Sequence, residues 1–156
     1  MPQAKVLAQL QESIDSGEER VSDRVLVDQK RIDLFAEATG DFQWIHVDAE
    51  RARAESPYKN TIAHGYLTLS LLPTLTKSVT DGGSQYEGVK LSVNYGSNRV
   101  RFPAPVVVDS RVRSRSRLKE VSEVAGGLQL VREVTVEVEG QEKPAMVAET
   151  VSRMYF

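Results

Sequence analysis

The chain has 156 residues, of which 40% are hydrophobic and 27% charged, a composition typical of one soluble globular domain. Its formal net charge of −2 does not suggest nucleic-acid binding, and the absence of cysteine excludes disulfides, thiolate metal sites and a cysteine nucleophile. The sequence shows neither an apolar signal segment nor a membrane-spanning run. We therefore expect a cytoplasmic enzyme or binding module without a membrane span.

The first half of the chain is predicted to be mainly helical. Apolar residues recur at helical spacing in residues 4–15 and 29–40, and they alternate as in a strand in residues 21–27. Gly17 breaks the first pattern, while Asp28 is a suitable N-cap for the second helix and Gly40 a suitable end. Asp48 likewise predicts a short helix over residues 49–55.

Residues 64–79 form the most apolar segment of the chain. Leucines surround most of the circumference that a helix would have here, which predicts a helix buried on all sides. A continuous apolar strand is the competing interpretation, but the length of the segment favours a helix. Pro73 is expected to kink this helix or to mark a change of register.

The second half of the chain is predicted to form strands. Four long segments alternate with a period of two: residues 89–102, 110–121, 128–140 and 144–156. Gly140 and the three residues after it predict a hairpin loop between the last two strands. Long antiparallel strands after one buried helix indicate an α+β fold, in which a curved sheet wraps around that helix.

Two titratable residues, Asp41 and His46, flank the apolar pair Trp44 and Ile45. One interpretation is an acid/base pair in an apolar pocket, and the competing one is a helix-ending turn beside a structural histidine. His64, the other histidine, is interpreted as ordering the loop before the central helix. Two histidines this far apart in a chain without cysteine make a poor zinc site, so we expect no metal.

Residues 35–52 and 62–73 resemble the MaoC-like (R)-specific enoyl-CoA hydratase and dehydratase family. The family's motif positions map, in chain order, onto Gly40, Asp41, Ile45, His46, His64 and Gly65. Residues 93–106 further resemble the NodN-like branch, so the likeness covers most of the chain from about residue 20. The commoner motif has Asn-Pro where this chain has Gln43 and Trp44, which we interpret as a subfamily difference.

The resemblance implies a single hot-dog domain over residues 1–156, with an antiparallel sheet around a long central helix and residues 1–20 as a helical extension. It also implies hydration of a 2-trans-enoyl-CoA to the (R)-3-hydroxyacyl-CoA, or the reverse dehydration, in fatty-acid metabolism. The expected substrate is an acyl-CoA or acyl carrier protein thioester, with no further cofactor, and the expected assembly is a homodimer.

The resemblance also suggests a role for each candidate residue. Asp41 and His46 are expected to move the two protons of the reaction as a coupled pair. Gly65, at the start of a buried helix, is expected to offer its backbone N–H to the thioester oxygen. Gln43, His64 and Asn98 complete the candidates for substrate binding. For Asn98, a contact with the active-site loop and a role at a strand irregularity near Gly96 stay open.

Two other activities compete with hydration. A hot-dog thioesterase is disfavoured because residues 64–79 contain no Asp or Glu. A noncatalytic acyl-binding module is disfavoured because Asp41, His46 and Gly65 are all present. Four arginines on one face of a predicted strand are interpreted as a solvated face rather than a site for the phosphates of coenzyme A: Arg111, Arg113, Arg115 and Arg117.

Overall fold

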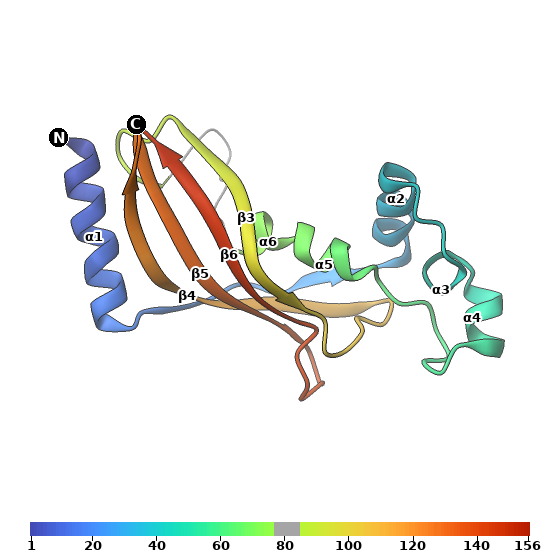
Figure 1. The fold of residues 1–156 in the computed structure, drawn as a ribbon. Coiled ribbons are helices and arrows are strands. Elements are labelled where there is room, and N and C mark those ends of the chain that lie inside the picture. The colour runs from blue at the N-terminus through green and yellow to red at the C-terminus, as the bar shows by residue number, and fades with distance from the viewer. Residues whose placement is uncertain (77–84) are drawn as a thin grey trace.

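A computed structural model describes residues 1–76 and 85–156. The strands are β1 (Glu19–Val21), β2 (Val25–Val27), β3 (Leu91–Arg101), β4 (Ser110–Val124), β5 (Gly127–Val138) and β6 (Met146–Tyr155). They form one antiparallel sheet in the order β1-β4-β5-β6-β3, and β2 also pairs with β4. Figure 1 shows that this sheet is strongly curved, as the fold predicted from the sequence requires.

Among residues 1–76, which precede the long strands, the helices are α1 (Pro2–Ser16), α2 (Gln29–Thr39), α3 (Trp44–Val47), α4 (Ala49–Glu55), α5 (Gly65–Ser70) and α6 (Leu72–Leu75). Figure 1 shows α5 and α6 within the curve of the sheet and α2 to α4 gathered beyond one end of it. None of the helices in residues 1–76 and 85–156 is long and apolar enough to cross a bilayer.

Local signals explain the ends of α2 and α4. The carboxylates of Asp28 and Asp48 accept hydrogen bonds from the backbone N–H groups of Arg31 and Arg51, each at 2.9 Å, as N-cap residues do. Gly40 ends α2 in a left-handed conformation with φ of 79°, which glycine adopts without steric cost. Both predicted helices are therefore confirmed, and Gly40 sets where the chain turns toward Asp41.

The central helix differs from the prediction in two ways. It is interrupted at Leu71, between α5 and α6, with Pro73 in the first turn of α6; the predicted kink is thus confirmed, and residues 77–79 lie outside the described part. It is also not buried on all sides, because Tyr66, Ser70 and Thr74 are exposed. These residues follow one another at intervals of four, so they share the helix face that the curved sheet leaves uncovered.

The predicted strand over residues 21–27 is two short strands rather than one. Both β1 and β2 pair with β4, but the ladder is interrupted between them. There the hydroxyl of Ser22 accepts the N–H of Ser114 at 2.9 Å, and so replaces a backbone carbonyl in the ladder. A side-chain acceptor at this point explains why the strand breaks.

The face of the sheet inside the curve carries two separate apolar clusters. One lies under α5 and α6 and includes Leu67, Leu72, Val134 and Val136. The other lies under α1 and consists of the buried residues Val6, Leu10, Leu118, Leu128, Leu130 and Met154. Helix α1 therefore covers its own part of the sheet, next to β4 and β5 (Figure 1).

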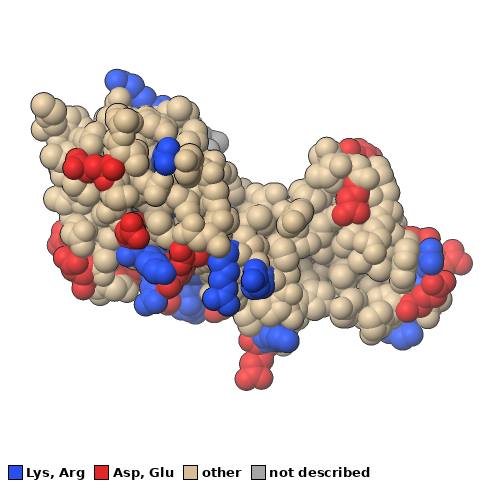
Figure 2. Space-filling view, viewed as in Figure 1, with Lys and Arg blue, Asp and Glu red and all other residues tan. Residues whose placement is uncertain are grey.

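The opposite, outer face of the sheet is charged. The arginines predicted to form a solvated face there pair with glutamates of neighbouring strands, including Arg113 with Glu137 at 2.7 Å and Arg117 with Glu133 at 2.6 Å. Figure 2 shows side chains of both signs mixed over this part of the molecule. The interpretation as a solvated strand face is confirmed.

Candidate active site

Asp41 and His46 are held by the turn that joins α2 to α3. The Asp41 carboxylate accepts the N–H of Gln43 at 3.2 Å, and the N–H of His46 bonds to the carbonyl of Gln43 at 2.9 Å. The turn role considered for Asp41 is therefore real, and its side chain is exposed. The Gln43 side chain is exposed as well, so in this structure Gln43 contributes through its backbone.

The structure brings Asp41, His46 and His64 together. One carboxylate oxygen of Asp41 and one ring nitrogen of each histidine all lie within 4.8 Å of one another. The two histidine rings are stacked, with centroids 3.8 Å apart and planes at 24°, and both histidines are buried. His64 thus belongs to the same cluster as the predicted pair, although 18 positions separate it from His46 in the chain.

Backbone carbonyls fix the position of one hydrogen on each ring. His46 Nδ1 lies 2.7 Å from the carbonyl oxygen of Ile62, and His64 Nε2 lies 2.9 Å from that of Asp41. Because a carbonyl oxygen can only accept, each of these nitrogens carries a hydrogen and donates it. Neutral His46 therefore keeps a lone pair on Nε2, which is the nitrogen available to accept a proton.

The surroundings of His46 favour its neutral form. Burial lowers the pKa of His46 from the ordinary value, and the neighbouring His64 lowers it further. The hydrogen bond to Ile62 and the charge of Asp41 act in the opposite direction but are outweighed. His46 is thus an imidazole base at neutral pH, as a proton acceptor must be.

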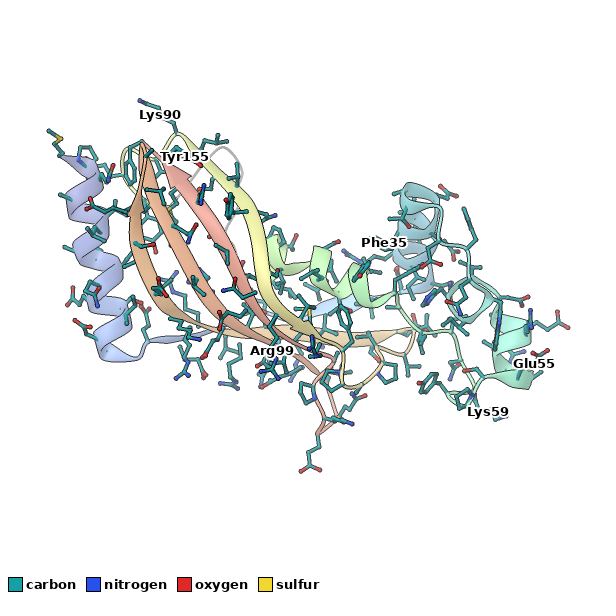
Figure 3. All side chains as sticks on the ribbon, in the orientation of Figure 1. Phe35, Glu55, Lys59, Lys90, Arg99 and Tyr155 are labelled. Carbon is teal, nitrogen blue, oxygen red and sulfur yellow. The ribbon has the colours of Figure 1, made fainter. Side chains whose placement is uncertain are left out.

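Two residues of α2 support the cluster: Gln29, to which no sequence pattern points, and Phe35, which the apolar spacing of residues 29–40 marks only as a core-facing residue. The side-chain amide of Gln29 donates to the backbone carbonyl of His46 at 2.8 Å and accepts from the hydroxyl of Thr61 at 2.5 Å. The ring of Phe35 lies 4.9 Å from that of His64, and Figure 3 shows Phe35 on the side of α2 that faces α5. These contacts join segments far apart in the chain, which local periodicity does not report.

Gly65 borders a pocket beside His46. The pocket has a volume of about 240 Å³, and His46, Gly65, Thr68 and Phe102 are among the residues that line it. A methyl group added at Gly65 would meet the Phe102 ring at 3.1 Å, which is tighter than ordinary contact. Within the described residues, no acceptor bonds the N–H of Gly65, so this donor is available to a ligand.

Asn98 lies elsewhere. It sits at an irregularity of the β3–β6 pairing, between Ser97 and Arg99, and donates to the Glu149 carboxylate at 2.7 Å on an exposed surface. Of the two roles left open from the sequence, the strand irregularity is the one observed. The structure does not bring Asn98 together with Asp41 and His46.

The cluster of Asp41, His46 and His64 is poorly arranged for a metal ion. A zinc ion lies in the plane of each imidazole that binds it, about 2.0–2.1 Å from the nitrogen. Two rings stacked at 3.8 Å and tilted by only 24° direct their lone pairs along nearly parallel planes, not toward one point. The arrangement is better suited to proton transfer.

The chain is similar to known proteins over most of its length. The model of the MaoC like domain family matches residues 9–141. The chain is 53% identical over 133 residues to 3-hydroxyacyl-thioester dehydratase Z of Mycobacterium tuberculosis, which covers 85% of each chain. It is 47% identical over 137 residues to nodulation protein N of Rhizobium leguminosarum bv. viciae, which covers 86% of this chain and 83% of that one.

Solved structures show the same fold at low sequence identity. The monoamine oxidase regulatory protein of Archaeoglobus fulgius aligns with a TM-score of 0.74 at 21% identity, over 88% of each chain. The (R)-hydratase of A. caviae aligns with a TM-score of 0.67 at 21% identity, over 86% of this chain and 92% of that one. The predicted α+β hot-dog fold is thereby confirmed, and the chain belongs to the MaoC-like domain family.

Proposed function

We propose that this protein is a hydro-lyase that adds water to a 2-trans-enoyl thioester to give the (R)-3-hydroxyacyl thioester, or catalyses the reverse dehydration. The observation that carries the proposal is the cluster of Asp41, His46 and His64 within 4.8 Å, beside a pocket bordered by Gly65. The relative named a 3-hydroxyacyl-thioester dehydratase supports the same reaction class.

In the hydration direction, the Asp41 and His46 pair takes one proton from water as the water oxygen bonds to C3. The pair then delivers one proton to C2, so it ends in the protonation state in which it began. Neutral His46 Nε2 and the Asp41 carboxylate are both proton acceptors at rest, and we treat them as one coupled acid/base unit. Positioned groups of this kind contribute about 10²–10⁴-fold each.

The thioester oxygen gains negative charge between these two steps. We place it against the N–H of Gly65, which stands at the start of α5 and faces no acceptor in the described residues. Losing one comparable oxyanion donor costs about 10²–10³-fold in rate in other enzymes. The absence of a Cβ at Gly65 lets the Phe102 ring lie close to the backbone at the edge of the pocket beside His46.

The assay that tests this function follows the loss of the conjugated enoyl-thioester absorbance with crotonyl-, hexenoyl- and dodecenoyl-CoA. We expect hydration of at least one of them, with the (R)-3-hydroxyacyl-CoA as the product by chiral analysis. A thiol reagent in a parallel sample reports release of free coenzyme A, and the background is low because the protein contains no cysteine. Coenzyme A release without hydration would mean a thioesterase, and neither signal would mean a binding module.

We also propose a homodimer that forms through β3. This strand is at the edge of the sheet and pairs only with β6 in the described part of the chain, and it is exposed along most of its length. An open edge of this length is a ready site for pairing with a second strand. Light scattering at micromolar concentration should give about twice the monomer mass of 17.3 kDa, and a monomer mass would refute the dimer.

A further inference from the structure

Arg132 occupies a core-facing position of β5. Residues 128, 130, 132, 134 and 136 alternate toward the inside of the curved sheet, and all but Arg132 are buried apolar residues. Leu130 belongs to the cluster under α1 and Val134 to the cluster under α5 and α6. Arg132 therefore lies in the gap between the two apolar clusters.

The partners of Arg132 differ from those of the outer arginines. Its guanidinium donates a hydrogen bond to the Tyr86 side chain, while Glu18 attracts it from a distance and Arg20 repels it. In residues 1–76 and 85–156, no carboxylate forms an ion pair with Arg132, whereas Arg113, Arg115 and Arg117 all have one. Burial lowers the pKa of Arg132, but a guanidinium stays charged in proteins, and a partly buried charge favours an anionic partner.

Two adjoining cavities meet at this arginine. The inner one has a volume of about 80 Å³ and is polar, with Arg20, Ser92, Ser116 and Ser152 among its lining residues. The outer one has a volume of about 460 Å³ and a mixed lining, in which Leu69, Leu72, Tyr95 and Val134 supply apolar surface and Ser70, Ser97 and Thr150 supply hydroxyl groups. Thr76, Asn94, Arg132 and Ser152 line both, so the apolar wall of the outer groove leads to the positive charge of Arg132 at its inner end.

The groove follows the same helices as the proposed active site. Gly65 and Thr68 line the pocket beside His46, and Leu69 and Leu72 line the groove further along. From Gly65 to Thr76, at the inner end, the helical rise amounts to about 16 Å. An extended acyl chain of roughly twelve carbons spans this length, at about 1.3 Å per carbon–carbon bond along its axis.

We propose that Arg132 binds a carboxylate at the far end of the acyl chain, so that the preferred substrates are thioesters of dicarboxylic acids. The proposal rests on the proposed function, because it takes the thioester end to lie at Gly65. The inner cavity of about 80 Å³ has room for only a small number of water molecules, because each water occupies about 10–15 Å³ of the cavity volume. It therefore suits a carboxylate better than the nucleotide end of coenzyme A.

The test compares hydration of 2-enoyl-CoA substrates of eight to twelve carbons with that of the same chains carrying a terminal carboxylate. We expect the wild-type protein to prefer the carboxylate-ended chain at one length of the series. Arg132→Met keeps an unbranched apolar stem but removes the guanidinium and its charge. It should lower the ratio of kcat/KM for the carboxylate-ended chain to kcat/KM for the plain chain by about tenfold or more. Arg132→Lys should retain part of the preference.

Arg117→Met is the matched control, because Arg117 lies on the outer face and pairs with Glu133; the ratio should stay as in the wild type. A wild-type protein without preference for the carboxylate-ended chain would overturn the proposal. So would an equal loss on both substrates in Arg132→Met, which would mean a structural arginine. A defect seen with coenzyme A thioesters but not with pantetheine thioesters would overturn it in favour of a phosphate of coenzyme A.

A binding measurement separates this proposal from the proposed function. Free sebacate should raise the thermal midpoint of the wild-type protein more than decanoate does, and this difference should vanish in Arg132→Met. That result does not depend on turnover, so it stands even if no thioester is hydrated. Equal effects of sebacate and decanoate would count against the arginine site itself.

Discussion

Polar and charged side chains have different partners on the outer face of the sheet and in the interior of the molecule. On the outer face, Arg113, Arg115 and Arg117 alternate along β4, and each has a glutamate partner within 3.0 Å. On the inner face, Arg132 has no ion-pair partner among the described residues. Beyond the end of the sheet, His46 and His64 donate hydrogen bonds to backbone carbonyls instead of pairing with a carboxylate side chain. Ion pairs between arginine and glutamate side chains are thus found on the outer face, which is exposed to water.

This difference teaches how to separate structural from functional polar groups in this fold. An exposed ion pair adds little to stability and leaves no capacity for a ligand. A buried ring held by a carbonyl, in contrast, keeps its second nitrogen free, as His46 does with Nε2. Function should therefore depend on the inner groups and be indifferent to the outer ones.

The largest loss of activity is expected at the proposed acid/base pair, and an active variant here would refute the functional difference between the inner and outer groups. Asp41→Asn and His46→Ala should each lower kcat by at least about 10²-fold. In Asp41→Asn the new amide oxygen can still accept the N–H of Gln43, so the turn should persist, whereas His46→Ala should lower the thermal midpoint because the carbonyl of Ile62 loses its partner. Steady-state kinetics on material with a native circular dichroism spectrum gives the answer, and turnover near the wild-type rate would reject the assignment.

Gly65→Ala should have the next largest effect, a loss of about tenfold or more that is visible in kcat as well as KM. The new methyl group meets the Phe102 ring at 3.1 Å, so the ring must move in the pocket where the thioester is placed. Stability should fall only modestly, because the φ of Gly65 is not in the left-handed region.

A second substitution makes this test sharper. Phe102→Leu should relieve the contact, so the double variant should recover activity relative to Gly65→Ala, with Phe102→Leu alone as the reference. If Gly65→Ala is instead destabilised but turns over normally per folded site, Gly65 serves only to lead the chain into α5.

The pH dependence tests the burial of His46. Its lowered pKa predicts that the acid limb of kcat/KM has a midpoint below 6.5, the ordinary value for histidine. As pH falls, His46 takes up a proton in the unfolded chain at a higher pH than in the folded protein. The contribution of neutral His46 to the free energy of unfolding should therefore be fully present above about pH 6.5 and be lost as pH drops through the folded-state pKa. In His46→Ala, the acid limb of kcat/KM and the loss of stability below about pH 6.5 should both be absent. If both persist in this variant, they belong to another titrating group.

The smallest effect is expected on the outer face. Arg117→Met should leave kcat and KM unchanged and shift the thermal midpoint by less than about 3 °C, because exposed ion pairs contribute little. A loss of activity here would contradict the division between the two faces. Parallel kinetics and differential scanning calorimetry on the same preparation would detect it.

Most of the fold could be predicted because its signals are local. Asp28 and Asp48 are caps within one turn of the groups they bond, and the long strands show their alternation residue by residue. The exposure of Tyr66 could not be predicted in this way, because it depends on how far the sheet extends around the helix.

The candidate site was predicted in part. Asp41, His46 and Gly65 follow from a motif, but the support from Gln29 and Phe35 comes from a helix that only the tertiary fold brings near. Arg132 did carry a local signal, since it interrupts a run of core-facing apolar residues in β5. For Asn98, the sequence left a contact with the active-site loop and a role at a strand irregularity open, and the irregularity between Ser97 and Arg99 depends on how β3 pairs with β6.

The interruption at Leu71 has a consequence for the order of folding. Helices of six and four residues are too short to persist alone in water, so α5 and α6 form only when the sheet is there to dock against. We expect their amides to exchange with deuterium sooner than those of β4 and β5, and substitutions in them to speed unfolding more than they slow folding. Helices α5 and α6, and with them the Gly65 side of the candidate site, would then be the last part of the molecule to assemble and the first to come apart.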